Sequence, residues 1–177
     1  MPDQVSVWDA VSSRRVVRRF ADRPLDDAHL DRILRAGRRA NSSKNQQRWA
    51  FIVCRDRDHL RQLGDVGTYA GHLAGAAAAI ALVTPDPTRA GASPSVMFDL
   101  GMAAESMILT AWELGIGSAP ATVYDQDLAR SLLGYPADHH CAFLLSFGYP
   151  ADRTDLTRPL KPGGRRPLAE LVHEERW

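Results

Sequence analysis

Apolar residues recur at helical spacing in the N-terminal part of the chain and predict two helices there. The first is short, takes Ser6 as its N-cap and runs directly into a group of arginines. The second covers residues 26–40, begins at Asp26 and ends before a polar segment, 41–48, that has no periodicity. The apolar face of this second helix is formed by Leu30, Ile33, Leu34 and Gly37.

Three short apolar runs, at 49–54, 77–84 and 141–150, are typical of buried strands. Further helices are predicted at 57–64, at 95–115 and, after a capping Asp125, at 126–134. The helix over 95–115 is apolar on nearly every face, which indicates burial in a core or at a subunit interface. Residues 115–125 are predicted to be a turn-rich loop. The tail, 151–177, has little periodicity and is expected to be disordered or to lie across a partner.

The composition is ordinary for a globular protein, with 177 residues of which 45% are hydrophobic and 24% charged, so we expect one domain over 1–177. No apolar run approaches the roughly 20 residues that span a bilayer, and the N-terminus does not resemble a secretory signal. Cys54 and Cys141 lie in apolar runs and are expected to be buried, reduced thiols of a cytoplasmic protein. No Cys or His pair has structural zinc spacing, so no metal is expected.

Positive charge is concentrated in residues 1–48, which hold 11 Lys or Arg against 6 Asp or Glu, although the net charge of the whole chain is +1. Four arginines lie within SSRRVVRRF, residues 12–20. Crowded guanidinium groups repel one another and gain most from a bound anion such as phosphate, although many such clusters are simply solvated faces. No aromatic residues are interleaved to stack on bases and no nucleic-acid motif occurs, so we do not expect a nucleic-acid partner.

Five segments occur in the order found in the nitroreductase-like flavoproteins: RRVVRRF, NSSKNQQRWAFIV, DLGMAAESMILTAWELGIGS, FGYP and RRPLAELVHEERW. The chain therefore resembles this family from about residue 7 to its end. The resemblance implies an α+β fold in which helices flank a central, mostly antiparallel sheet. It also implies an obligate homodimer with one FMN per site at the dimer interface. In such a dimer the tail, 151–177, crosses to the partner subunit, where PLAELV adds a strand to the sheet.

The arginine cluster resembles the family pattern Arg-Arg-Ser-x-Arg, which grips the phosphate and ribityl chain of FMN. The matching positions here are Arg14, Arg15, Val16 and Arg18. Val16 replaces the usual serine, which removes one hydroxyl group from the pattern. We expect Arg19 to point into solvent. Near the end of the chain, Arg165 matches a family position that reaches the phosphate, and its neighbour Arg166 is an alternative to it.

Two further segments are expected at the flavin ring. The first resembles the turn that runs along the flavin edge, and its matching residues are Ser42, Ser43, Asn45 and Gln47. Asn41 and Arg48 stand where prolines are usual, which predicts a looser loop and a guanidinium beside the ring. Taken without the resemblance, these residues are equally typical of a turn that has no ligand.

The second segment comprises Pro120, Ala121 and Thr122, whose backbone is expected to pack beneath the ring and to direct an N–H at the reactive flavin N5. Without the resemblance it is only a connector between two helices. Tyr69 and His72 lie just before a predicted strand, where relatives often place an amide or a base near the pyrimidine edge of the ring. A cation or donor there would stabilise the reduced flavin.

The resemblance implies an FMN-dependent NAD(P)H oxidoreductase that passes hydride through flavin N5 to a small acceptor such as a nitroaromatic or a quinone. No side chain is assigned as a catalytic acid or base. A specialised member that uses a deazaflavin, oxidises an azoline or consumes its own flavin is one alternative, and a flavin-binding storage or sensor dimer is another. The chain lacks a Rossmann glycine motif and a recognisable nucleophile elbow, so a dinucleotide-binding Rossmann domain and a hydrolase are not expected.

Overall fold

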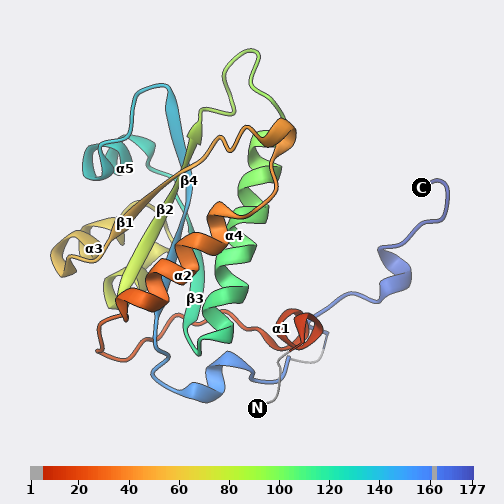
Figure 1. Cartoon of the computed structure of the whole chain (residues 1–177), viewed down its shortest axis with the longest axis horizontal. Coiled ribbons are helices and arrows are strands. Elements are labelled where there is room, and N and C mark those ends of the chain that lie inside the picture. Colours follow the sequence, from red (N-terminus) through yellow and green to blue (C-terminus); the bar gives the residue numbers. More distant parts are fainter. Residues whose placement is uncertain (1–5, 161–162) are drawn as a thin grey trace.

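A four-stranded sheet forms the centre of the fold, and helices cover both of its faces (Figure 1). The computed structural model describes residues 6–160 and 163–177. Every strand pair is antiparallel, and the strands lie in the order β1-β2-β4-β3. Their bounds are Ala50–Cys54 for β1, Ala78–Pro85 for β2, Gly117–Thr122 for β3 and His139–Gly148 for β4. The predicted α+β fold with an antiparallel sheet is confirmed.

The helices begin close to the predicted caps. Ser6 and Asp9 form a reciprocal capping box at the start of α1, and Asp26 and Asp125 cap α2 and α5. The α-helices are α1 Val7–Ser13, α2 Asp27–Arg38, α3 Arg57–Leu63, α4 Ser95–Glu113 and α5 Gln126–Leu133. Short 3-10 turns are η1 Ser43–Asn45, η2 Ala70–Gly75, η3 Arg153–Leu156 and η4 Leu168–Glu170.

The sheet separates two hydrophobic cores. On one face α2 and α4 pack against the strands, and the buried residues there include Ile33, Ile80, Leu100, Met107 and Phe147. On the other face α3, η2 and α5 cover a core that includes Leu60, Leu63, Leu73, Ala121 and Leu144. Cys54 and Cys141 belong to this second core, and burial raises the pKa of their thiols to about 11 and about 12. Both are free and buried, as predicted.

Helix α4 is buried on one side only, so burial in the core is confirmed for that side and the subunit interface stays a prediction. One side is in the core, where Gly37 of α2 lets the two helices approach so closely that a methyl group on this glycine would overlap Met107. The other side is open, and Phe98 is 70% exposed. Among the described residues, no helix is long and apolar enough to cross a membrane.

The prediction of a loop over residues 115–125 was wrong, because this segment contains strand β3 at one edge of the sheet. Its sequence, GSAPAT, lacks the β-branched and aromatic residues that mark strands, so propensity alone could not reveal it. Pro120 is tolerated because it lies on an edge strand, where its missing N–H breaks no ladder hydrogen bond. Pairing with the long strand β4 decides the conformation of this segment.

Candidate active site

Residues 14–20 run beside the outer edge of β3. The N–H of Val17 donates to the carbonyl oxygen of Ser118 at 3.0 Å, and the Val17 side chain is 1% exposed. A side chain at Gly117 would overlap Val17, so this close approach depends on the glycine. Because side chains alternate along an extended segment, burial of Val17 leaves Arg18 exposed at the surface.

The predicted phosphate-binding arginines differ in their surroundings. Arg18 makes no hydrogen bond or ion pair with any described residue, so its guanidinium is free to bind a ligand. Arg14 forms an ion pair with Glu105 of α4 at 3.2 Å, and its buried Nε has no partner among the described residues. Arg19 forms only a 3.6 Å ion pair with Asp155 and its side chain is 77% exposed, in keeping with the expected solvated position.

Arg15 is engaged with the protein's own backbone. Its guanidinium donates to the carbonyl oxygens of Ser12 at 2.9 Å, Arg14 at 2.8 Å and Arg158 at 2.8 Å. Arg158 makes a reciprocal contact, because its guanidinium donates a 3.1 Å hydrogen bond to the carbonyl oxygen of Val16. These bonds join the arginine cluster to the segment around η3 and hold its backbone in a defined conformation.

The outer edge of β3 carries backbone groups that point away from the sheet. Val17 uses the Ser118 carbonyl, and the N–H of Val123 donates inward to Ala142 of β4. Since backbone groups of an edge strand point alternately into and away from the sheet, the N–H of Thr122 points outward. Gly67 packs against the carbonyl oxygen of Thr122, where any larger side chain would overlap it. The segment before η2 therefore packs against the carbonyl of the Thr122–Val123 peptide, which is next to the peptide that carries the Thr122 N–H.

His72, in η2, lies close to this edge. Its Nδ1 is 3.0 Å from Oγ of Ser146, and that hydroxyl donates to the carbonyl oxygen of Ala119 at 3.1 Å. Burial, followed by the nearby charge of Arg18, lowers the pKa of His72 below its ordinary value, while the carbonyl of Pro120 acts in the opposite direction. His72 is therefore neutral at physiological pH. Tyr69, predicted together with His72, is largely exposed.

The turn predicted at the flavin edge has an unusual backbone conformation. Lys44, Asn45 and Gln47 all have positive φ, at 54°, 54° and 47°, although none of them is glycine. Ser42 supports this turn, because its Oγ accepts a 2.9 Å hydrogen bond from the N–H of Gln47. Strained conformations of this kind cluster at ligand sites, where the surrounding structure holds them in place.

Asp99 of α4 also holds this turn in place. Its carboxylate is 4% exposed and accepts a 3.0 Å hydrogen bond from the N–H of Ser43. Neither Asp99 nor Glu105, which lies about one and two-thirds turns further along the same helix, was predicted from the sequence. The available signal was an acidic residue within an otherwise apolar helix, because a buried carboxylate is retained only where it has a partner.

One chain does not bring all the predicted residues together. The arginine cluster, His72 and the edge of β3 form one surface, whereas the turn over Ser42–Gln47 lies near the other end of α4 (Figure 1). Arg165 and Arg166 lie in the projecting tail, where they donate to Gly164 and to Glu170 respectively. Within a single chain these residues therefore do not form one site.

The chemistry available at the edge of β3 is that of holding a ligand. It offers a free guanidinium, an outward backbone N–H and a neutral imidazole. No cluster of three metal-binding side chains occurs within residues 6–160 and 163–177, and the two thiols are buried and protonated. This set can bind an anionic, planar, hydrogen-bonding molecule, but it does not itself contain an activated nucleophile.

Comparisons with known proteins give the family. A family description reading "Nitroreductase family" matches residues 11–69 and 67–149. A relative from Archaeoglobus fulgidus, provisionally named NADH dehydrogenase/NAD(P)H nitroreductase, is 34% identical over 173 residues, which cover 94% of this chain and 96% of the relative. A Thermus thermophilus NADH dehydrogenase is 26% identical over 200 residues, covering 92% and 93%.

Solved structures share the fold. An FMN-dependent nitroreductase from Clostridium difficile superposes with a TM-score of 0.81 at 24% identity, covering 95% of this chain and 98% of the other. A protein from Parabacteroides distasonis gives a TM-score of 0.82, also at 24% identity, covering 96% and 98%. The sheet order, the two layers of helices and the family match over most of the chain agree, and this protein belongs to the nitroreductase family.

Proposed function

We propose that this protein is an FMN-dependent NAD(P)H oxidoreductase. The observation that carries the proposal is the outer edge of β3, where the unpaired guanidinium of Arg18 and the outward N–H of Thr122 share one surface. The family membership and the names of the relatives support an oxidoreductase. These residues fit a flavin, which needs a cation for its phosphate or reduced ring and a donor for N5.

The residues would divide the work of binding. Arg18, with Arg14 beside it, meets negative charge, and the Thr122 N–H donates to N5 against the backbone of Pro120 and Ala121. Arg15 acts chiefly by holding the backbone of Val16 and its neighbours, since its own donors are largely occupied. Ser42, Ser43, Asn45 and Gln47 come from a second copy and complete the site from the other side. Arg165 and Arg166 add positive charge once the tail has docked.

A bound flavin supplies hydride transfer from NADH or NADPH to a small acceptor, such as a nitroaromatic or a quinone. The chain supplies orientation, the N5 hydrogen bond and a surface from which water is excluded when the dimer forms. No side-chain acid or base at the β3 edge is needed for hydride transfer, which agrees with the absence of an activated nucleophile among the described residues of that edge.

The homodimer in this proposal is supported by exposed apolar surface. Val7, Trp8 and Val11 of α1 are all exposed, as is Phe98 of α4. Apolar surface this extensive is uncommon on monomeric proteins and marks interaction sites. Because α1 leads directly into the arginine cluster, burying these residues would bring a second copy up to the β3 edge.

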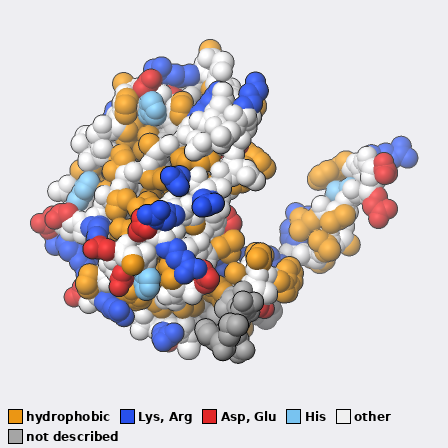
Figure 2. All heavy atoms as spheres, in the orientation of Figure 1, with side chains coloured by type: hydrophobic (Ala, Val, Ile, Leu, Met, Phe, Trp, Pro, Cys, Tyr) orange, Lys and Arg blue, Asp and Glu red, His pale blue; other side chains and the backbone are white. Residues whose placement is uncertain are grey.

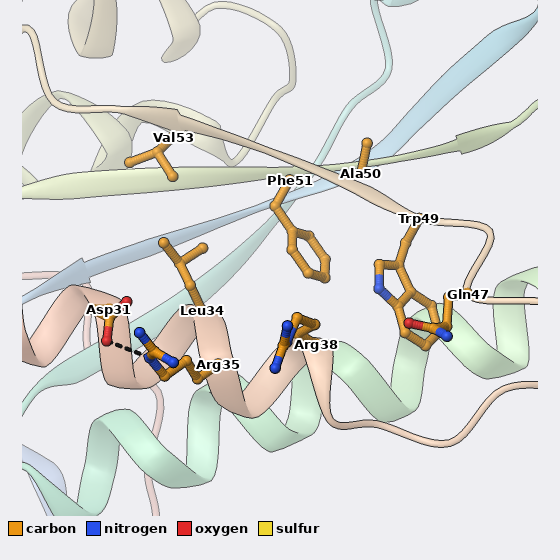
Figure 3. Close-up of a pocket in the computed structure, with 9 residues that line it drawn as sticks. All are labelled: Asp31, Leu34, Arg35, Arg38, Gln47, Trp49, Ala50, Phe51 and Val53. Carbon is orange, nitrogen blue, oxygen red and sulfur yellow. Dashed lines mark hydrogen bonds and ion pairs between the residues drawn. The ribbon is translucent and has the colours of Figure 1, made fainter. Parts of the chain in front are cut away.

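A groove on the first subunit can accept the tail of the second copy. Residues 163–177 project from the body of the protein and carry apolar side chains, among them Leu168, Leu171 and Val172 (Figure 2). The open edge of β1 and helix α2 enclose a groove of about 580 Å³, lined by Leu34 and Phe51 (Figure 3).

Charged residues occur on both sides of this proposed contact. Arg35, Arg38 and Asp31 line the groove, and residues 163–177 carry three arginines and three glutamates, of which Glu170 pairs with Arg166. An extended segment that adds to the unpaired edge of β1 satisfies its backbone groups and buries its apolar side chains. We therefore include exchange of the tail in the proposed dimer, with 1–177 as a single domain. Of the predicted segment 151–177, residues 151–158 pack on their own chain, so residues 163–177 are the part that would cross.

The test is an absorption spectrum of the purified protein, repeated after FMN is added and unbound flavin is removed. We expect a yellow protein that NADH or NADPH bleaches in the absence of oxygen, and a nitroaromatic or quinone restores the colour. A protein that stays colourless with FMN contradicts the proposal. A yellow protein that neither nucleotide reduces would instead favour flavin storage or a different electron donor.

A further inference from the structure

The proton positions on His72 follow from its hydrogen bonds. The Ser146 hydroxyl has one proton, which it donates to the carbonyl oxygen of Ala119 at 3.1 Å. It must therefore accept at its contact with Nδ1 of His72, 3.0 Å away, so the neutral imidazole carries its proton on Nδ1. The other nitrogen, Nε2, then bears a lone pair. This atom is buried and has no hydrogen-bond partner among the described residues.

Opposing influences act on the charge of His72. Burial is the largest cause that disfavours a second proton, and the charge of Arg18, from the segment beside β3, adds to it. From β3 the carbonyl of Pro120 favours that proton, and from β4 Ser146 accepts from Nδ1 in either state. A negative charge that entered beside Arg18 would offset the repulsion between Arg18 and a protonated His72, and would attract the imidazolium directly.

We propose that His72 takes up a proton at Nε2 when two electrons enter the site beside Arg18. This inference rests on the proposed function. The electron donor delivers a hydride, which carries two electrons and one proton to the bound ring. The additional proton comes from solvent and binds Nε2 of His72, so the negative charge gained by the ring is matched by a positive charge on the imidazole. On reoxidation the proton returns to solvent.

His72 therefore acts as a positioning and charge-compensating residue whose state follows that of the ring. A permanent cation would stabilise the reduced ring and would also hold positive charge in the site when the ring is oxidised. A histidine beside Arg18 becomes charged only in the reduced state, because its proton affinity depends on the negative charge nearby.

The experiment follows the His72 side chain by NMR, with ¹³C and ¹⁵N labelling, in the flavin-free, oxidised and dithionite-reduced protein. His72→Gln identifies the resonance among the six histidines. We expect Nδ1 to be protonated and Nε2 unprotonated at neutral pH in the first two states. Reduction should increase the proton affinity of His72 about tenfold or more, as expected for a new charge a few ångströms away in a partly buried site.

A second readout is the dependence of the flavin midpoint potential on pH. The natural chain should take up two protons for two electrons near neutral pH, whereas His72→Gln should take up one. His59→Gln is the matched control, because Nε2 of His59 is also buried without a described partner but lies on α3, away from Arg18. This control should behave like the natural chain.

Ser146→Ala keeps a titratable His72 and removes only the acceptor for its Nδ1 proton. This variant should allow both neutral tautomers of His72, and reduction should then increase the proton affinity of His72 by less. If the protein binds FMN and is bleached by NAD(P)H while the proton affinity of His72 is the same in both redox states, the inference is overturned and the proposed function stands. If no flavin binds, the spectrum alone overturns both.

Discussion

The two edges of the sheet have opposite character. The edge at β1 is apolar and open, with Trp49 and Phe51 stacked at 6.4 Å beside a groove. The edge at β3 is covered by the chain itself, because Val17 bonds to Ser118 at one end and Gly67 packs on Thr122 at the other. Arg18 and His72 lie at the β3 edge, whereas the arginines beside β1, Arg35 and Arg38, come from helix α2.

This difference suits the β1 edge to assembly and the β3 edge to ligand binding. An open, apolar edge is a template for another strand, and it is a hazard unless a specific partner covers it. An edge fixed by its own neighbours can hold one backbone donor in a constant direction, which is what a cofactor requires. The two edges are at opposite sides of one sheet, so each can be disturbed without directly altering the other.

Removal of residues 167–177 should have the largest effect. Without the tail, the groove beside β1 stays open, and we expect dimer dissociation to increase on the order of 1000-fold, about 4 kcal/mol. Analytical ultracentrifugation measures this effect. A full-length variant with Leu168, Leu171 and Val172 changed to Ser should dissociate similarly, since it loses the same apolar contacts. Two fully dimeric variants would contradict the role assigned to the β1 edge.

Gly67→Ala should disturb the β3 edge next most strongly. The new methyl group overlaps the carbonyl oxygen of Thr122, so either the strand end or the segment before η2 must shift. We expect a loss of about 2–3 kcal/mol in the free energy of unfolding, measured with urea, as for an overpacked site. Gly71→Ala is the control, because nothing lies within 4 Å of its added carbon. Equal stability of the two variants would mean that the Thr122 carbonyl is not held in this way.

Arg18→Ala should weaken FMN binding by about 10- to 30-fold, since charged hydrogen bonds to phosphate or a reduced ring contribute about 1.5–2 kcal/mol. Fluorescence titration of the flavin measures the dissociation constant. Arg19→Ala makes an equal change of charge one residue away, at a side chain that points into solvent. If both variants bind FMN equally well, net charge matters and the particular position of Arg18 does not.

The smallest effect concerns pH. The folded pKa of His72 is below its ordinary 6.5, so the unfolded state binds the proton more readily. The free energy of unfolding of the flavin-free protein should therefore fall as the pH drops below about 6.5, and His72→Gln should show a shallower decrease. Urea unfolding between pH 7 and pH 5 measures this difference. A steeper decrease in the variant would contradict a neutral His72.

Local signals made the helices predictable. Side chains at Ser6, Asp26 and Asp125 cap helices in the structure as they were expected to from sequence, and Gly115, with φ of 73°, follows the end of α4. Strand β3 could not be predicted in this way. It is a strand because β4 pairs with it, and long-range pairing leaves no periodic trace in a segment of small residues.

For the proposed site, the resemblance named only part of what the structure shows. Arg18 and the backbone at Thr122 were named from it, and their role in binding stays a prediction. The roles of Arg15 and Asp99 were not visible, because they depend on carbonyls of η3 and on a turn that the chain brings near only on folding. Sequence similarity identifies which residues meet a ligand more readily than which residues hold them in place.

Pro120 has a consequence for the size of the assembly. A molecule with two open strand edges can add copies at both ends and grow into a filament, whereas a symmetric pair must stop at two. Here β1 is the edge that can accept a strand, while β3 carries a proline and is already bordered by residue 17 and by η2. Pro120, which lies beneath the flavin ring in the proposed site, would then also limit the number of subunits.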